Sequence, residues 1–210
     1  MANLFLAILV STYFSLVGCQ TSVSVMVWED ELVKPNTPAN MQLNFLSKAQ
    51  DVRTQAVDQV GRHTISLLMI PGPTVTTERE HLDDAIAKRV KSALQLCGYT
   101  INEVDKIKES KGPVLVVQID DLRNYLFSWI YPLGLVWGKM ELSLHLMSPE
   151  GKELWRANAE GHGGIMASLL YMSGFETRVT SDLTANVNQI IEIVSSEQFK
   201  NELRKAQSGS

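Results

Sequence analysis

A strict alternation of apolar and polar residues between Val136 and Leu146 constrains the fold of this chain most. From Met140 onwards, methionine or leucine occupies every second position, which is the period of a β-strand with one buried face. The turn sequence Ser-Pro-Glu-Gly follows at 148–151, and a second alternating segment includes Trp155. Proline and glycine stand where a type I turn prefers them. These features predict a β-hairpin, whose apolar face needs a covering layer.

Two segments with apolar residues at every third or fourth position predict that layer. The first follows a Thr77–Glu80 capping-box spacing and runs to Cys97, with Gly98 as a left-handed terminator. The second begins near Glu176 and carries a stripe expected to be buried. The stripe consists of Val179, Leu183, Val187, Ile190, Ile191 and Val194.

Further strands are predicted at 64–70, 99–104 and 114–119, since these runs are rich in β-branched and other apolar residues. The first of them is expected to stop at Pro71-Gly72-Pro73. The resulting order, β-α-β-β-β-β-α, predicts an α+β fold. It consists of a mixed β-sheet with a β-hairpin and two amphipathic helices packed on one face.

The N-terminal residues carry a targeting pattern. Residues 4–17 are uncharged and largely apolar, which suits a signal peptide and falls short of the roughly 20 residues of a spanning helix. They lead into Leu16-Val17-Gly18-Cys19, which resembles the lipobox of bacterial lipoproteins. That resemblance implies a signal peptide at 1–18 and lipidation, by palmitate among other acyl chains, at Cys19. The alternative is an apolar core helix that carries this tetrapeptide by chance.

Because Gln20 rather than aspartate follows the cysteine, the resemblance also implies the outer membrane, with the protein lipid-anchored on the periplasmic face. We expect a lipidated N-terminus and tether at 19–62, an α/β domain at 63–196 and a polar tail at 197–210. Within the tether, residues 41–60 would also permit a helix.

The layout of the domain is similar to that of small periplasmic lipoproteins. The shared elements are the proline-stopped strand ending at Ile70, the helix running into Gly98, and the hairpin that carries Trp155. The proteins it resembles are the YajG-like proteins, the auxiliary lipoproteins of envelope transport systems, and the amino-terminal domain of TolB. The resemblance is one of layout and does not choose among them.

Charge and cysteine content indicate whether nucleic acid is an expected partner and whether a disulfide can form. The formal net charge is −4 at pH 7, and basic residues are scattered, so we expect no nucleic-acid partner. The two cysteines are Cys19 and Cys97. If Cys19 is lipidated, no internal disulfide can form, and Cys97 is expected to lie in the core as a small apolar side chain.

An aromatic stretch before the hairpin is the candidate interaction surface. Aromatic residues are enriched at interfaces, and exposed apolar patches usually mark them. The stretch would therefore contact a partner protein or lipid, or else fold inward and complete the core. The same two interpretations apply to the apolar segment 165–175. The candidate residues are Tyr125, Phe127, Trp129, Tyr131 and Trp137.

No catalytic or metal-binding motif is recognisable. The four histidines are far apart in sequence, and the pairs Asp83-Asp84 and Asp120-Asp121 do not converge by themselves. No G-x-S-x-G elbow is present. We therefore expect no catalytic residues, metal or cofactor.

These observations predict a non-enzymatic outer-membrane lipoprotein, a binding or assembly component of an envelope protein complex. Its expected partners are envelope proteins and, through the lipid anchor, the membrane. The alternative is a lipid- or ligand-handling accessory lipoprotein of an envelope transport system. Whether the chain forms a homo-oligomer stays open.

Overall fold

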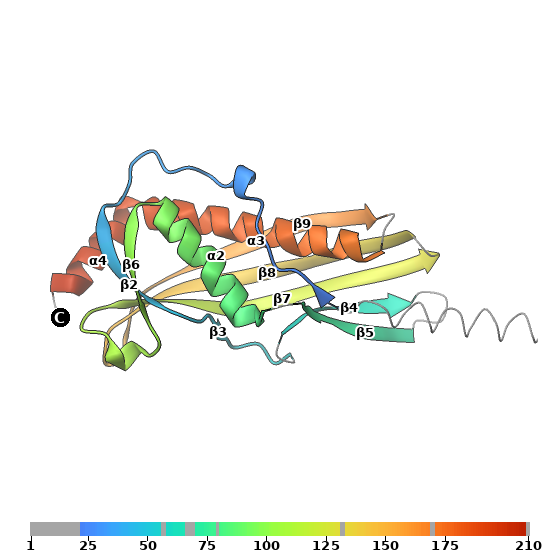
Figure 1. Cartoon of the computed structure of the whole chain (residues 1–210), viewed down its shortest axis with the longest axis horizontal. Coiled ribbons are helices and arrows are strands. Elements are labelled where there is room, and N and C mark those ends of the chain that lie inside the picture. The colour runs from blue at the N-terminus through green and yellow to red at the C-terminus, as the bar shows by residue number, and fades with distance from the viewer. Residues whose placement is uncertain are drawn as a thin grey trace, which may run out of the picture.

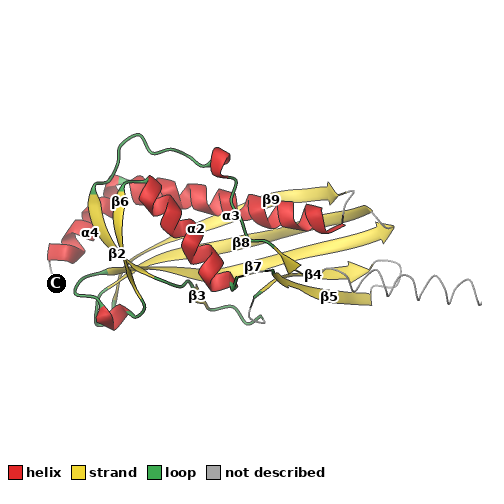
Figure 2. Cartoon of the chain, in the orientation of Figure 1, coloured by secondary structure: helices red, strands yellow, loops and turns green. Residues whose placement is uncertain are grey.

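The computed structural model describes residues 22–55, 58–65, 70–78, 80–130, 133–168 and 171–208. They form a nine-stranded mixed sheet with helices on one face (Figures 1 and 2), which confirms the predicted α+β fold. The strands are β1 (Ser22–Val23), β2 (Met41–Leu46), β3 (Gln50–Asp51), β4 (Gln59–Ile65), β5 (Ile70–Thr77), β6 (Tyr99–Val104), β7 (Val114–Ile130), β8 (Leu133–Met147) and β9 (Glu153–Ser168). The helices are α2 (Leu82–Leu96), α3 (Tyr171–Ser195) and α4 (Glu197–Ser208), with short 3-10 helices η1 (Glu29–Glu31) and η3 (Ile107–Glu109).

Strand β7 organises the sheet. Its first part pairs in parallel with β2 and β3, and its last part pairs in parallel with β4. Its other side pairs with β8 along almost the whole length, and β8 pairs with β9. The long strands β7, β8 and β9 and the β4–β5 pair therefore reach in one direction, away from β2 and β6 (Figure 1). We call the end where β4, β7 and β9 finish the tip end.

The predicted hairpin is present as β8 and β9. Its turn includes a hydrogen bond from the Gly151 amide to the Ser148 carbonyl at 2.9 Å, and Gly151 adopts a φ of +86°. Glycine is favoured there because other residues are strained at positive φ. The hairpin is longer than the alternating segment alone predicts, since β8 begins at Leu133.

Helix α3 covers the inner face of the sheet along β8 and β9, and α2 packs beside it (Figure 1). Every residue of the predicted stripe from Val179 to Val194 is buried in the core. Leu126, Val136 and Met140 meet this layer from the sheet. The helical periodicity thus predicted the buried face of α3 correctly.

Residues 22–62, expected as a tether, contribute to the folded domain. They supply β1, β2, β3 and the start of β4, and Leu43 and Phe45 of β2 are buried in the core. The Trp28 amide donates to Thr184 Oγ1 at 3.0 Å, which fastens this segment to α3. The helix considered for 41–60 is replaced by strands, because β2 gains parallel partners in both β6 and β7.

The run expected as one strand at 64–70 begins in β4 and ends in β5, which pair antiparallel, and residues 66–69 lie outside the described residues. Pro71 and Pro73 lie inside β5 instead of ending a strand. Strand β1 pairs with β5 only at Thr76 and Thr77. The prolines therefore fall on a stretch of β5 that has β4 on one side, and an edge position of this kind tolerates a missing N–H.

Helix α2 is capped differently from the capping box expected from Thr77. Thr77 belongs to β5, and the Leu82 amide donates instead to Asp58 Oδ1 at 2.8 Å. At the other end, Gly98 has the predicted left-handed conformation, with a φ of +83°. Asp58 lies far upstream in sequence, so a local motif could not identify it.

The segment expected as a polar tail at 197–210 forms helix α4 through Ser208. Phe199 is fully buried, with its ring centroid 4.9 Å from that of Trp155 and 6.1 Å from that of Tyr99. Cys97 is buried as expected, and burial raises the pKa of its thiol. Among the described helices, none combines the length and apolar character required to span a bilayer.

Candidate interaction surface

The aromatic stretch is part of the sheet itself. Residues 125–130 continue β7 and residues 133–137 begin β8, so these residues form a β-hairpin and not a connection. In β7, Leu122, Asn124 and Leu126 are buried toward the helices. Because side chains alternate between the faces of a strand, Tyr125 and Phe127 occupy the outer face.

Tyr125 and Trp137 form the centre of this outer face. The two residues pair directly across β7 and β8, and their rings stack with centroids 5.7 Å apart and an interplanar angle of 24°. Their exposed fractions are 37% and 38%. Such cross-strand aromatic pairs stabilise a sheet, yet a large part of both rings still meets solvent.

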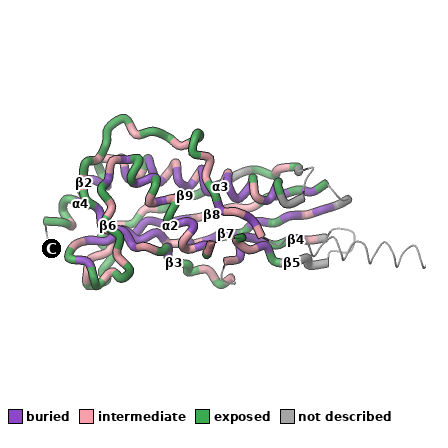
Figure 3. Tube along the Cα trace, in the orientation of Figure 1, coloured by how far each residue is buried: buried purple, intermediate pink, exposed green. Residues whose placement is uncertain are grey.

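Further exposed apolar residues lie between this aromatic pair and the tip end, and beside the pair on β9. Phe127 is half-buried and pairs with Leu135, which is exposed. Leu133 is 50% exposed, and Ile165 is 75% exposed in β9 opposite the bulge at Trp137. Figure 3 shows buried and exposed segments of the strands toward this end. We call this set the outer apolar surface: Tyr125, Phe127, Leu133, Leu135, Trp137 and Ile165.

A charged band borders the outer apolar surface on the side away from the tips. Lys139 Nζ lies 2.8 Å from Asp121 Oδ2 and 2.7 Å from Glu141 Oε1. Arg123 also pairs with Asp121, at 2.6 Å. Burial by itself would raise the pKa of Asp121, but hydrogen bonds from Arg123 and Lys139 lower it below its usual value. On the outer face of β7 and β8, the ion pairs of Arg123 and Lys139 therefore lie two residues before the aromatic rings of Tyr125 and Trp137.

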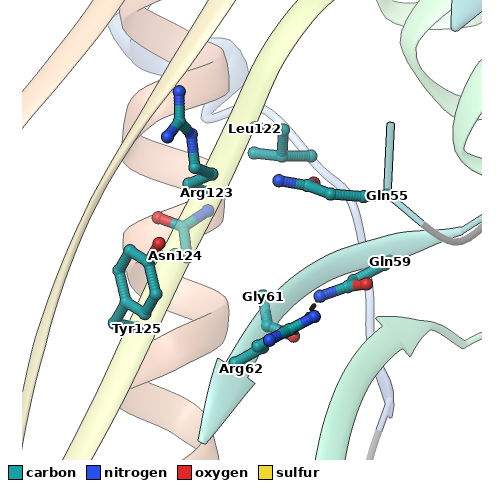
Figure 4. Close-up of a pocket in the computed structure, with 8 residues that line it drawn as sticks. All are labelled: Gln55, Gln59, Gly61, Arg62, Leu122, Arg123, Asn124 and Tyr125. Atoms are coloured by element: carbon teal, nitrogen blue, oxygen red, sulfur yellow. Dashed lines mark hydrogen bonds between the residues drawn. The ribbon is translucent and has the colours of Figure 1, made fainter. Parts of the chain in front are cut away.

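A small pocket lies beside Tyr125, between β4 and β7. Figure 4 shows Arg62 and Gln59 from β4 opposite Asn124 and Tyr125 from β7. Its volume is about 110 Å³, well below the several hundred Å³ of typical ligand sites. The pocket suits a few water molecules, and the aromatic rings do not enclose a ligand cavity there.

Behind this surface, a buried ion pair holds α3 against the strands. Arg178 Nε donates to Asp182 Oδ2 at 2.9 Å, and both side chains are almost fully buried. The same guanidinium donates to the carbonyl of Gly138 at 2.6 Å and to that of Gly164. A Cβ atom at Gly161 would lie 2.3 Å from the Asp182 carbonyl oxygen. The glycine therefore allows β9 and α3 to approach closely.

A chain of Ser143, His145 and Glu153 was missed by the sequence reasoning. His145 Nε2 lies 2.8 Å from Ser143 Oγ, and His145 Nδ1 lies 2.5 Å from Glu153 Oε2. This atom order is that of a hydrolase triad. The Ser143 side chain, however, has an exposed fraction of 0%, so no substrate reaches its hydroxyl. The i, i+2 spacing of Ser143 and His145 on one strand face was the available signal.

His63 and Ser128 form a second buried pair, with His63 Nε2 at 3.0 Å from Ser128 Oγ. Burial lowers the pKa of His63 to about 4, so this imidazole is neutral at pH 7. Among the described residues, no group of three or more His, Cys, Asp or Glu side chains is placed to hold a metal ion. Among the described histidine side chains, His63 contacts Ser128, His81 contacts Asp58 and His145 contacts Ser143 and Glu153, so these three do not share one site.

The candidate residues fall into three groups: exposed residues, a half-buried residue, and residues whose side chains lie outside the described part of the chain. Tyr125 and Trp137 are exposed, and Phe127 is half-buried between them and the tip. Trp129 belongs to β7, but its side chain lies outside the described residues, as do all of Tyr131 and Cys19. Leu133, Leu135 and Ile165 belong to the two apolar stretches considered from the sequence but were not singled out, because their exposure follows from strand register and not from composition.

Comparison with known proteins gives similarity of fold. No family model matches the sequence, and no curated protein matches it. A neuraminyllactose-binding hemagglutinin homolog from Helicobacter pylori has a similar structure, with a TM-score of 0.51 at 9% sequence identity, over 82% of this chain and 95% of that chain. Protein XCC0632 from Xanthomonas campestris gives 0.44 at 12% identity, over 87% and 98% of the two chains. Lipoprotein GNA1162 from Neisseria meningitidis gives 0.29 at 13% identity, over 71% and 99%. The Helicobacter pylori protein shares the fold of this chain.

Proposed function

We propose that this protein is a lipid-anchored component of the bacterial envelope that acts by binding and not by catalysis. The observation that carries the proposal is the outer apolar surface, which leaves Tyr125 and Trp137 exposed on the sheet. Exposed apolar patches on folded domains usually mark contact sites. The Leu16-Val17-Gly18-Cys19 pattern supports the anchor, and the periplasmic face of the outer membrane is its proposed location.

A binding role also fits the buried polar groups. The nucleophile-like Ser143 is covered, and the neutral His63 is enclosed beside Ser128. General acid–base or nucleophilic catalysis requires such groups within reach of a substrate. The envelope partners of an assembly would instead meet the outer face of the sheet.

Handling of a small ligand is the second candidate function. The outer apolar surface is a flat sheet face, and the pocket beside Tyr125 holds about 110 Å³. An acyl chain would therefore lie along the surface and not inside a cavity. This arrangement favours contact with a large surface over transport of a single enclosed molecule.

The lipid anchor is tested by replacing Cys19 with serine. We expect the wild-type chain to incorporate labelled palmitate and to be processed, because the sulfur of Cys19 is the proposed acyl attachment point. The Cys19→Ser chain should remain an unlabelled precursor. Cys97→Ser is the matched control and should keep its label, since Cys97 is buried in the core. Equal labelling of the wild type and the Cys19→Ser chain would contradict the anchor.

A further inference from the structure

The tip end of the sheet carries no charged residue in its described part. Arg62, Arg123 and Lys139 are the last charged residues of their strands before the tips. Beyond them, the described strand segments contain apolar residues, glycine, proline, serine, threonine, asparagine and histidine. These segments are 63–65, 70–74, 124–130, 133–138 and 162–168. Exposed apolar patches usually mark contact with a partner protein or a membrane.

The pairing of residues between strands gives the distance by which the tip end extends beyond Ser22, the first described residue. Through β5, Ser22 lies on the same rung as Gln59. Farther along β4, Arg62 pairs with Tyr125, and β7 then continues to Ile130. At about 3.3 Å per strand residue, the tips lie roughly 25 Å beyond the rung of Ser22.

Strand β1 runs away from the tip end. Strand β1 is parallel to β5, and β5 begins at the tip end with Ile70 paired to Ile65. Cys19 precedes Ser22 by three residues, a distance that even a fully extended chain spans with at most about 11 Å. With the strands upright, an acylated Cys19 at the bilayer surface leaves the tips roughly 14 Å farther into the bilayer.

We propose that the tip end inserts into the leaflet that holds the lipid anchor. This proposal rests on the proposed function, since it uses Cys19 as the attachment point. Leu133, on the last rung of the β7–β8 ladder, then lies among acyl chains, because the overhang exceeds a headgroup layer of about 5–8 Å. Leu135 lies two residues closer to the headgroups, and Ile165, opposite Trp137, lies at the headgroup level. The stacked Tyr125 and Trp137 lie at the headgroup level, where aromatic rings with one polar group are favoured.

The charged band fits the same placement. Arg123 and Lys139 pair two residues before Tyr125 and Trp137 on the same face of the sheet, where basic side chains can meet lipid phosphates. Strands β5 and β9 have a partner on one side near the tips in the described sheet. Unpaired backbone groups are costly in hydrocarbon, so insertion is limited to the tips. The bilayer is therefore the envelope component that the tip end meets.

The test places a fluorescent label at either end of the sheet. Leu133 and Leu154 are both exposed leucines on neighbouring strands, with exposed fractions of 50% and 40%, at opposite ends of the β8–β9 ladder. Leu133→Cys and Leu154→Cys are made in the full chain with Cys97→Ala, and each is labelled with an environment-sensitive dye. The lipid-anchored proteins are reconstituted in vesicles of phosphatidylethanolamine and phosphatidylglycerol, with or without brominated acyl chains.

Brominated lipid is expected to quench the dye at Leu133 and to leave the dye at Leu154 unchanged. Absence of quenching at Leu133, or equal quenching at both positions, would overturn the insertion. A protein cross-linked to the Leu133 position in whole envelopes, in place of lipid, would also overturn it. Mass spectrometry of the same samples reports acylation of Cys19 separately. A missing acyl chain therefore counts against the anchor, whereas an acylated chain without quenching counts against insertion.

Discussion

Replacing Asp182 with alanine is expected to lower the free energy of unfolding by about 3–5 kcal/mol, because it leaves a buried guanidinium without its counter-ion. Arg178 is 3% exposed at its side chain and donates to Asp182 and to backbone carbonyls of β8 and β9. These hydrogen bonds join the first turns of α3 to the strands that support the outer apolar surface. The loss should therefore appear as a large shift of the chemical denaturation midpoint.

Two further variants distinguish the effect of losing the ion pair on the denaturation midpoint from general effects of substitution. The double variant Arg178→Met and Asp182→Leu removes both charges, and we expect it to recover a large part of the lost stability. Lys48→Ala removes an exposed ion pair with Asp84 and should leave the midpoint almost unchanged. An Asp182→Ala midpoint equal to that of Lys48→Ala would show that the buried pair does not hold α3 in place.

Phe199→Ala is expected to cost about 3–5 kcal/mol, the range for truncation of a fully buried aromatic side chain. The ring of Phe199 packs on Trp155 of β9 and lies edge-on to Tyr99 of β6. Its loss would therefore detach α4 from the sheet as well as leave a cavity. Arg204→Ala, at an exposed position of the same helix, is the control. If both substitutions give the same small change in chemical denaturation, α4 is not docked on the sheet.

The elements predicted from sequence are those with a regular local period. The hairpin alternation from Met140 and the helical stripe of α3 each repeat several times within one element. A repeat of this kind can be recognised within the element itself, without knowledge of its partners in the fold. Gly98 and Gly151 likewise mark their turns through their own backbone preference.

The elements missed depend on residues far apart in sequence. Strand β2 is short, and its stability comes from parallel pairing with β6 and β7. Strand β7 was expected to end at Ile119, before Asp120-Asp121, yet it continues because Asp121 pairs with Arg123 and Lys139 on the outer face. No local pattern contains these partners.

The candidate surface was predictable in part. The high aromatic content of the stretch identified Tyr125, Phe127 and Trp137 as candidates, but composition alone does not distinguish an exposed from a buried position. Their face is set by the register between β7 and β8 and by the side of the sheet that α3 covers. The contact of Ser143 with His145 also depends on register and burial, and it was not predicted.

The most direct test of the central claim compares adjacent positions on opposite faces of the same two strands. Tyr125 and Trp137 form one rung, and Leu126 and Val136 form the next, buried against the helices. The measurement is chemical denaturation of Tyr125→Ala, Trp137→Ala and Leu126→Ala in parallel. The account predicts a loss of about 2–5 kcal/mol for Leu126→Ala and of about 1 kcal/mol or less for each aromatic variant. Equal, severe destabilisation by all three would place the aromatic pair in the core and contradict the existence of an outer contact surface.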